Sequence, residues 1–206
     1  MAGPGGGRQP RTKPRGDAWN GAAKRLMAVL LAAFVLLLAH VAAAQDLTGR
    51  VVGITDGDTL TLLVNRRQQV RVRLSDIDTP ERRQPYGTRA RQDLSGLVFR
   101  KTVRVVVRDT DRYGRTVGRV HAGAVDVNAE LVRLGAAWVY RDYSNDPALL
   151  RLEATARCER RGLWRLPEAE RVPPWEWRAL RRHGPGARGA ATAAPPDGSS
   201  ATSRCR

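Results

Sequence analysis

The stretch from residue 47 to residue 81 constrains the fold most, because it holds three short apolar runs separated by polar turns. The first two runs, 47–55 and 59–64, are rich in Val, Leu, Ile and Thr and flank the turn Asp56-Gly57-Asp58. Such a pattern is typical of two strands joined by a tight turn. The third run, 69–74, alternates apolar and polar residues, as a half-buried strand does. The stretch therefore predicts three consecutive β-strands.

The rest of the chain predicts further strands separated by helices. Apolar residues at helical spacing and β-forming runs mark these elements: helices at 88–101, 129–134 and 147–161, strands at 103–107 and 115–121, and a brief strand or turn at 124–127. We expect Asn128 to cap the second helix and Gly135 to end it. This order predicts an α+β fold, a five-stranded Greek-key β-barrel of the OB-fold type with about three α-helices.

Acidic residues gather where the first strands end. Asp56 and Asp58 lie in the first turn, and Asp78-Thr79-Pro80-Glu81 follows the third strand. If these strands pair, the two acidic clusters meet. Carboxylate and carbonyl oxygens, without His or Cys, suit Ca²⁺ or Mg²⁺ better than Zn²⁺. The sequence therefore predicts a site for a hard cation.

The same stretch and one later loop contain what phosphodiester hydrolysis requires, namely cations on the phosphate oxygens and a base for water. Arg73 and Arg115 can each donate two hydrogen bonds to a phosphate, and Glu81 can accept a proton. Each feature has an ordinary alternative when taken alone. The acidic segments also suit simple turns, and Arg115 could be a surface arginine.

The charge of the chain points to a polyanionic partner. The net charge is +16, from 36 Lys and Arg against 20 Asp and Glu, and the isoelectric point is about 11.4. The segment before Gln45 carries only +5 of this charge, so the domain itself is basic. A strongly basic domain favours nucleic acid as a partner. The alternative is a basic surface that is merely solvated.

The N-terminal segment 1–44 is typical of an export signal. Basic residues up to Arg25 precede an apolar run at 26–44 that ends in three alanines. Residues 26–44 could instead remain as a membrane anchor, because the run is long enough to span a bilayer. Both alternatives predict export, either secreted or periplasmic, or anchored with the domain facing outside.

We expect residues 45–166 to form the domain and residues 167–206 to form a basic tail. Trp175 and Trp177 should pack back on the domain, whereas the composition after about residue 184 predicts disorder. Cys158 and Cys205 either form one disulfide bond or remain two thiols. The tail could also hold the protein on an anionic envelope surface.

Six segments resemble the thermonuclease family, whose domain is that of staphylococcal nuclease: ITDGDTLTL, VRVRLSDIDTPE, PYGTRARQDL, DTDRYGRTVGRV, VNAELVRLGAAWVY and RRGLW. They occur in the family's order between Leu47 and Trp164. The resemblance implies a monomer that cleaves DNA and RNA with Ca²⁺. It also implies attack by water with loss of the 5′ oxygen, which leaves 3′-phosphate ends.

The resemblance also assigns roles by position. Asp58 and Asp78 match the metal-binding carboxylates and Thr79 the carbonyl ligand, with Asp56 in the outer surroundings. Arg73 and Arg115 match the phosphate-binding arginines, and Glu81 matches the general base, although it could instead orient the water. Candidates for contacts to base and phosphate are Tyr113, Tyr140 and Tyr143.

Two segments depart from the family pattern, and one alternative function remains. The loop after Glu81 is shorter than in well-known secreted members, and the segment 136–145 aligns only with a gap. A related module without catalysis would bind nucleic acid only. Such modules lose the acids or the arginines. Here all five are present, namely Asp58, Arg73, Asp78, Glu81 and Arg115.

Overall fold

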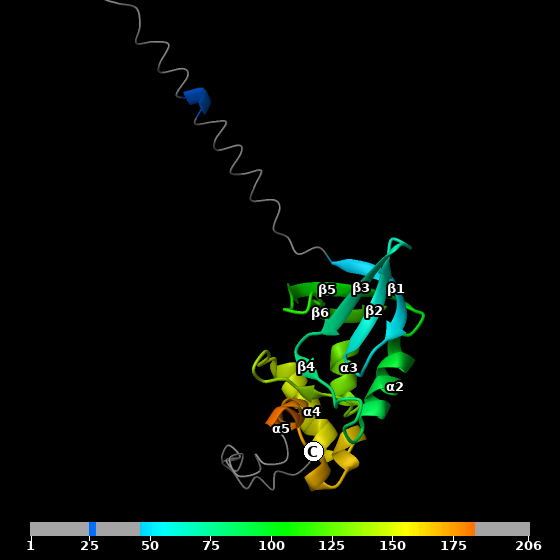
Figure 1. Ribbon diagram of the computed structural model, residues 1–206, viewed down its shortest axis with the longest axis vertical. Helices are drawn as coiled ribbons and strands as arrows, with labels where there is room; N and C mark the ends of the chain where they lie inside the picture. Colours follow the sequence, from blue (N-terminus) through cyan, green and yellow to red (C-terminus); the bar gives the residue numbers. More distant parts are fainter. Residues whose placement is uncertain (1–24, 28–45, 184–206) are drawn as a thin grey trace, which may run out of the picture. The chain divides into compact units, whose positions relative to one another are not determined.

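Five strands close into a barrel in the computed structural model, which describes residues 25–27 and 46–183 (Figure 1). Neighbouring strands run in the order β3-β2-β1-β5-β6, and a parallel pairing of β3 with β6 closes the barrel. The predicted fold class, a five-stranded OB-fold barrel with helices, is confirmed. The strands are β1 Leu47–Ile54, β2 Thr59–Val64, β3 Gln68–Leu74, β5 Thr102–Thr110 and β6 Thr116–Ala122.

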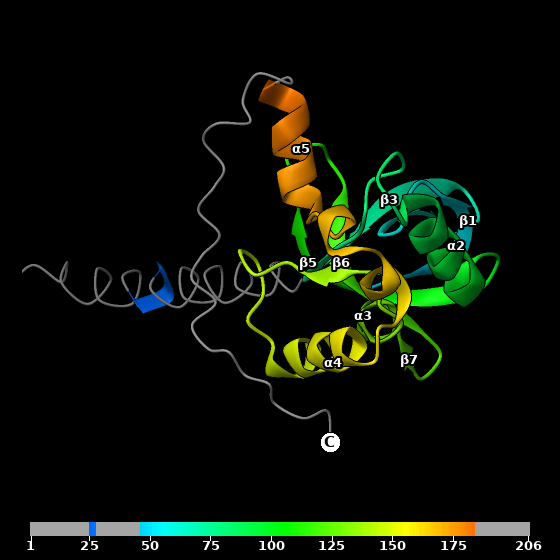
Figure 2. The same cartoon turned by 90° about the horizontal axis from the view of Figure 1, so that it is seen from below.

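Helices and three short strands surround the barrel. The short strands are β4 Ile77–Asp78, β7 Val125–Asp126 and β8 Trp138–Val139, and β4 pairs with β8. The α-helices are α2 Gly87–Val98, α3 Val127–Arg133, α4 Pro147–Cys158 and α5 Pro174–His183, with 3₁₀ turns η1 Gly162–Arg165 and η2 Glu168–Glu170. The sequence predicts the first three helices but not α5. Seen from below, α5 extends away from α4 (Figure 2).

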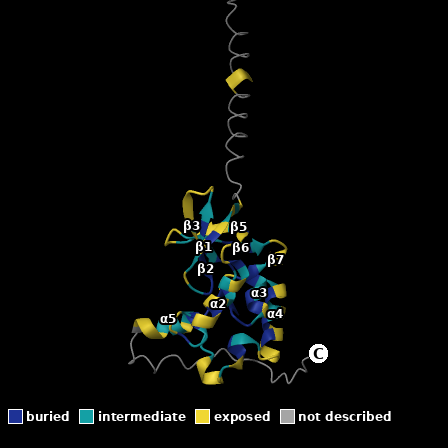
Figure 3. Cartoon of the chain, turned by 90° about the vertical axis from the view of Figure 1, so that its right-hand side faces the viewer, coloured by how far each residue is buried: buried dark blue, intermediate teal, exposed yellow. Residues whose placement is uncertain are grey.

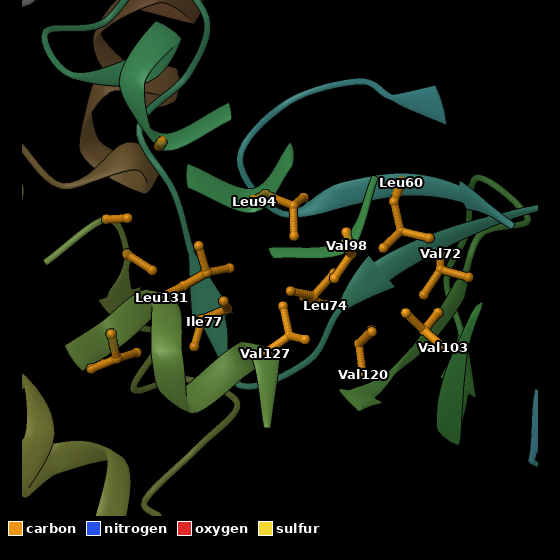
Figure 4. Close-up of a cluster of buried hydrophobic side chains, with 14 of the residues drawn as sticks. Leu60, Val72, Leu74, Ile77, Leu94, Val98, Val103, Val120, Val127 and Leu131 are labelled. Carbon is orange, nitrogen blue, oxygen red and sulfur yellow. The ribbon is translucent and has the colours of Figure 1, made fainter. Parts of the chain in front are cut away.

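The core lies between the inner faces of the strands and the helices α2 and α3 (Figure 4). On β3, Val72 and Leu74 are buried whereas Arg71 is exposed, so the predicted alternation is confirmed. α3 is mostly buried, whereas α5 is exposed or half-buried along most of its length (Figure 3). The core therefore supports the barrel and α3, and α5 is attached through other contacts.

The expected helix cap at Asn128 is wrong. Asp126 caps α3, because its carboxylate accepts the Ala129 N–H at 3.1 Å. Asn128 lies inside the helix and is fully buried. Its Oδ1 accepts the Val120 N–H at 3.0 Å and its Nδ2 donates to the Ser75 carbonyl at 2.8 Å. Asn128 therefore joins α3 to β6 and to the segment before β4.

Several expectations concern residues outside the described part of the chain. These are most of the export signal, Cys205 as partner of Cys158, and the tail from residue 184. Trp175, by contrast, packs on the domain as expected, with its ring 5.2 Å from that of Tyr140. Within residues 25–27 and 46–183, no helix is long and apolar enough to span a bilayer.

Candidate active site

Arg73 lies between the two acidic clusters. In the antiparallel pairing of β2 with β3, Thr59 is opposite Arg73, which places the preceding Asp58 beside the arginine. One guanidinium nitrogen forms an ion pair with Asp58, and the other donates to Asp78 Oδ1 at 2.8 Å. The Arg73 side chain is only 15% exposed. The pairing of β2 with β3 brings Asp58 onto the guanidinium, and the short segment after β3 brings Asp78 onto it.

The turn before β2 is packed tightly against Thr79. Asp58 Oδ2 accepts both the N–H and the hydroxyl of Thr79, each at 2.9 Å. A Cβ at Gly57 would lie 2.7 Å from the Thr79 hydroxyl oxygen and 2.8 Å from the Ala90 Cβ. Such distances are too short for any side chain, so the approach of Asp58 to Thr79 requires glycine at position 57.

Glu81 lies in a turn that Gln84 holds. The Gln84 N–H donates to the Glu81 carbonyl at 2.8 Å, and the Glu81 N–H donates to Gln84 Oε1 at 3.0 Å. The buried Gln84 side chain also donates to the Val172 carbonyl. The Glu81 carboxylate itself is 38% exposed. Glu81 therefore has a fixed backbone and a carboxylate that solvent can reach.

Arg178 reaches the same acids from α5. Its guanidinium forms ion pairs with Asp78 Oδ2 at 2.7 Å and with Glu81 Oε1 at 2.9 Å. These hydrogen bonds raise the pKa of Arg178 although burial opposes its charge. The sequence pattern misses this residue, because Arg178 follows Asp78 by 100 residues and lies among many other arginines.

Arg115 immediately precedes β6, and its side chain reaches the start of β2. Its Nε donates to Asp111 Oδ2 at 2.7 Å, and one terminal nitrogen lies 3.5 Å from the Thr59 hydroxyl oxygen. Hydrogen bonds from Arg115 and Tyr113 outweigh burial and lower the pKa of Asp111. Asp111 thus remains charged and orients the Arg115 guanidinium toward the start of β2.

The three tyrosines differ in their surroundings. Tyr113 is 61% exposed, and the guanidinium of Arg115 lies 5.6 Å from the centre of its ring. Tyr143 is 75% exposed. Tyr140 stacks on Trp175 with an angle of 1° between the rings, so one face of Tyr140 is covered. Burial and the charge of Asp78 raise the pKa of Tyr140, which places it near the acids.

Burial raises the pKa of two acids of the site, Asp56 and Asp78. Burial and the neighbouring Asp58 raise the pKa of Asp56 to about 7. Burial also raises the pKa of Asp78, against the hydrogen bond from Arg178 and the charge of Arg73. Buried carboxylates with raised pKa values gain free energy from an added cation. No group of three or more His, Cys, Asp or Glu side chains suited to a metal occurs in the described residues.

Oxygen donors nevertheless fit a hard cation at this place. Two nearby carboxylates, Asp58 and Asp78, have only oxygen atoms to offer, and Thr79 adds a backbone carbonyl in the same segment. Ca²⁺ prefers such ligands and often takes several of them from backbone and water. The predicted ligand set contains only two carboxylates, because its third member is a backbone carbonyl. It would therefore not count as a group of three His, Cys, Asp or Glu side chains.

Comparison with known proteins supports the family resemblance that the sequence motifs indicate. Residues 71–166 match the model of the family described as staphylococcal nuclease homologue. The chain is 49% identical over 168 residues to protein ParB of Escherichia coli, covering 75% of this chain and 93% of that protein. It is 46% identical over 164 residues to a micrococcal nuclease of Shigella flexneri, covering 74% and 92%.

A third relative is an uncharacterized endonuclease of Escherichia coli O157:H7, which is 47% identical over 134 residues, or 65% of this chain and 86% of that protein. In all three pairs the matched region spans most of the relative. With nearly half of the residues identical over such lengths, the chain belongs to the staphylococcal nuclease family.

Proposed function

We propose that this protein, a nuclease of the staphylococcal type, is exported and hydrolyses DNA and RNA with Ca²⁺, leaving 3′-phosphate ends. Its class as a phosphodiester hydrolase follows from its family. The single observation that carries the finer proposal is the position of Arg73, buried between Asp58 and Asp78 with Arg115 nearby. This arrangement supplies cationic donors and acidic ligands at one place.

The two arginines would bind the phosphate that is attacked. Guanidinium groups donate paired hydrogen bonds to phosphate oxygens, and these bonds strengthen as negative charge builds up in the transition state. Arg73 is held by Asp58 and Asp78, and Arg115 by Asp111, so both donors are oriented before substrate binds. Preorganised donors need no rearrangement during the reaction, which is why they accelerate it.

Glu81 would take the proton from the attacking water. Its carboxylate is partly exposed, so water can reach it, and its backbone is fixed by Gln84. Asp58, Asp78 and the Thr79 carbonyl would hold Ca²⁺, which neutralises charge on the phosphate when bound. In the described structure Arg178 contacts Glu81 Oε1, so it must shift or share that carboxylate when Glu81 acts as base.

The test measures cleavage of single-stranded DNA by the purified chain from residue 45, with Ca²⁺ and with a chelator. Glu81→Gln and Arg73→Lys should each lower the rate about 100- to 1,000-fold, the usual effect of losing one such group. The matched control is Arg71→Ala, because Arg71 lies on the same strand two residues away and is exposed. This control should cleave at nearly the normal rate.

Two outcomes would overturn the proposal. Normal cleavage by both site variants would remove Glu81 and Arg73 from the mechanism. Tight binding of DNA without any cleavage would instead identify a binding module. Calcium binding is checked separately by titration calorimetry, where Asp58→Asn and Asp78→Asn should abolish the heat of binding without unfolding the protein.

Export and substrate range rest on different observations. The signal-like segment 1–44 supports export, and protease accessibility of the protein in intact cells would test it. Contacts to backbone phosphates carry no sequence information, so a site built from arginines and acids favours broad action on DNA and RNA. Cleavage of unrelated oligonucleotides at similar rates is the expected result.

A further inference from the structure

Helix α5 lies outside the matched family region, which ends at residue 166, yet it is firmly attached next to the site. Trp175 stacks on Tyr140, and the centre of its ring lies 6.0 Å from that of Trp138 in an edge-to-face arrangement. Arg178 forms ion pairs with Asp78 and Glu81. Aromatic stacking and these ion pairs fix the position of the helix relative to the acids of the site.

The other end of α5 carries positive charge that the domain does not neutralise. Arg181 and Arg182 are exposed on the last turns of the helix. Within the described part of the chain, neither forms an ion pair. Most other arginines near the site are already paired with acids, for example Arg73, Arg115 and Arg178. Arg181 and Arg182 therefore remain available for an external anion.

A hollow joins these arginines to the active site. It has a volume of about 320 Å³ and is lined by Glu81, Trp177, Arg178, Arg181 and Arg182. Glu81 belongs both to the hollow and to the proposed catalytic group. A strand whose phosphate lies at Arg73 and Arg115 can therefore continue across Glu81 into the hollow.

The side chains that line the hollow indicate which kind of ligand it would bind. Three guanidinium groups and a tryptophan ring, with one carboxylate, attract a polyanion that also has flat apolar groups. Single-stranded nucleic acid has this composition. An acidic peptide would offer charge without regular spacing and would not explain why the hollow adjoins a phosphodiester-cleaving site.

We propose that α5 forms an additional substrate-binding wall, in which Arg181 and Arg182 bind backbone phosphates of the strand next to the bond that is cleaved. This inference rests on the proposed function, because the strand is the substrate. Arg178 acts as a positioning residue that holds the helix against Asp78 and Glu81. These contacts of α5 would increase the affinity for the nucleic-acid strand and fix the direction in which that strand leaves the active site.

The test measures binding of a fluorescent single-stranded oligonucleotide by anisotropy at several salt concentrations, using the full chain with Glu81→Gln so that the strand stays intact. Arg181→Ala with Arg182→Ala should weaken binding roughly tenfold. It should also reduce the slope of log affinity against log salt by about 1.4, since each lost phosphate contact removes about 0.7.

The matched control is Arg67→Ala with Arg151→Ala, which removes the same charge from exposed positions on the β2–β3 turn and on α4. Replacing both α5 arginines with lysine should restore most of the affinity, which excludes damage to the helix. Equal losses in the alanine pair and the control would show that only overall charge matters. An unchanged affinity in the α5 pair would also overturn the inference.

Cleavage by the otherwise unchanged protein separates this inference from the proposed function. If that protein does not cleave, the proposed function fails. If it cleaves and the α5 variants bind normally, only the inference about α5 fails. The lysine variants also report on mechanism, because they should raise KM little while alanine variants raise KM with kcat nearly unchanged.

Discussion

Arg73 shows how function and stability are linked at the scale of single residues. Its guanidinium neutralises two buried carboxylates, so removing it would leave Asp58 without this ion pair and Asp78 with Arg178 as its remaining cation. Removing one partner of a buried ion pair typically costs about 3 to 5 kcal/mol, a large share of the stability of a domain. Arg73→Lys, which keeps a charge there, is therefore a better probe of catalysis than Arg73→Ala.

The meeting of the acids with Arg73 is predictable from the sequence, because local strand pairing and turns determine their position. Asp58 and Arg73 are neighbours in a hairpin, so the pattern of strands and turns places them together. Gln84 and Arg178 are different, because their partners come from distant segments. No local pattern distinguishes Arg178 from the other arginines of the tail, and only tertiary structure identifies it.

Gly57 provides a prediction at this scale. Gly57→Ala should lower the free energy of unfolding by about 1 to 3 kcal/mol, because the added Cβ overlaps Thr79 and Ala90. Urea denaturation measures the change. The control is Gly96→Ala in α2, where no atom lies within 4 Å of the added Cβ and alanine favours the helix. An equal loss at both positions would contradict the packing argument.

At the scale of elements, one arginine on β6 connects the beginnings of two helices. Arg119 donates to Asp126 at 2.6 Å and to Asp146 at 3.1 Å, and these residues cap α3 and α4. The sequence predicts these helices within a few residues. It misplaces the cap of α3, because the rule that favours Asn at a cap cannot detect that Asn128 is buried.

Asp146 provides a pH-dependent prediction. The Ala148 N–H and Arg119 lower the pKa of Asp146 in the folded protein. Asp146 therefore stabilises the fold above its unfolded pKa of about 3.9, and this contribution is lost as the pH falls through the lower folded value. Asp146→Ala should cost about 1 kcal/mol at neutral pH and progressively less below about pH 4.

Denaturation of the two proteins across this pH range measures the difference. Asp146→Asn serves as the control, because asparagine still caps the helix but carries no charge. It should retain much of the stability at every pH. A difference between wild type and Asp146→Ala that stays constant down to pH 2 would exclude the carboxylate as the cause.

At the scale of the whole molecule, the segment after residue 166 packs against the loops that carry the acids of the site. Trp175 covers Tyr140, and the carbonyl of Val172 accepts a hydrogen bond from Gln84. The sequence predicts that Trp175 packs on the domain, because large aromatic residues in a polar tail favour burial. It does not predict the helix, since the segment is short, although Pro174 stands at its first position, where proline is compatible with a helix.

Truncation tests the contribution of this segment. A chain from 45 to 166 should be less stable than a chain from 45 to 183 by about 2 kcal/mol, because Trp138 and Tyr140 lose their aromatic cover. The melting temperature should fall by about 8 °C. Calorimetry of both chains measures the difference, and equal melting temperatures would mean that α5 adds no stability.

The parallel pairing of β3 with β6 also has a consequence for refolding. It pairs Val72 with Thr116 and Arg73 with Val117, so it also brings Arg115 beside the start of β2. The two arginines are far apart in the chain, and no hairpin can bring them together. A refolding molecule therefore gains its phosphate-binding pair only when β3 and β6, the two ends of the strand order, have joined, and recovery of cleavage would report that event directly.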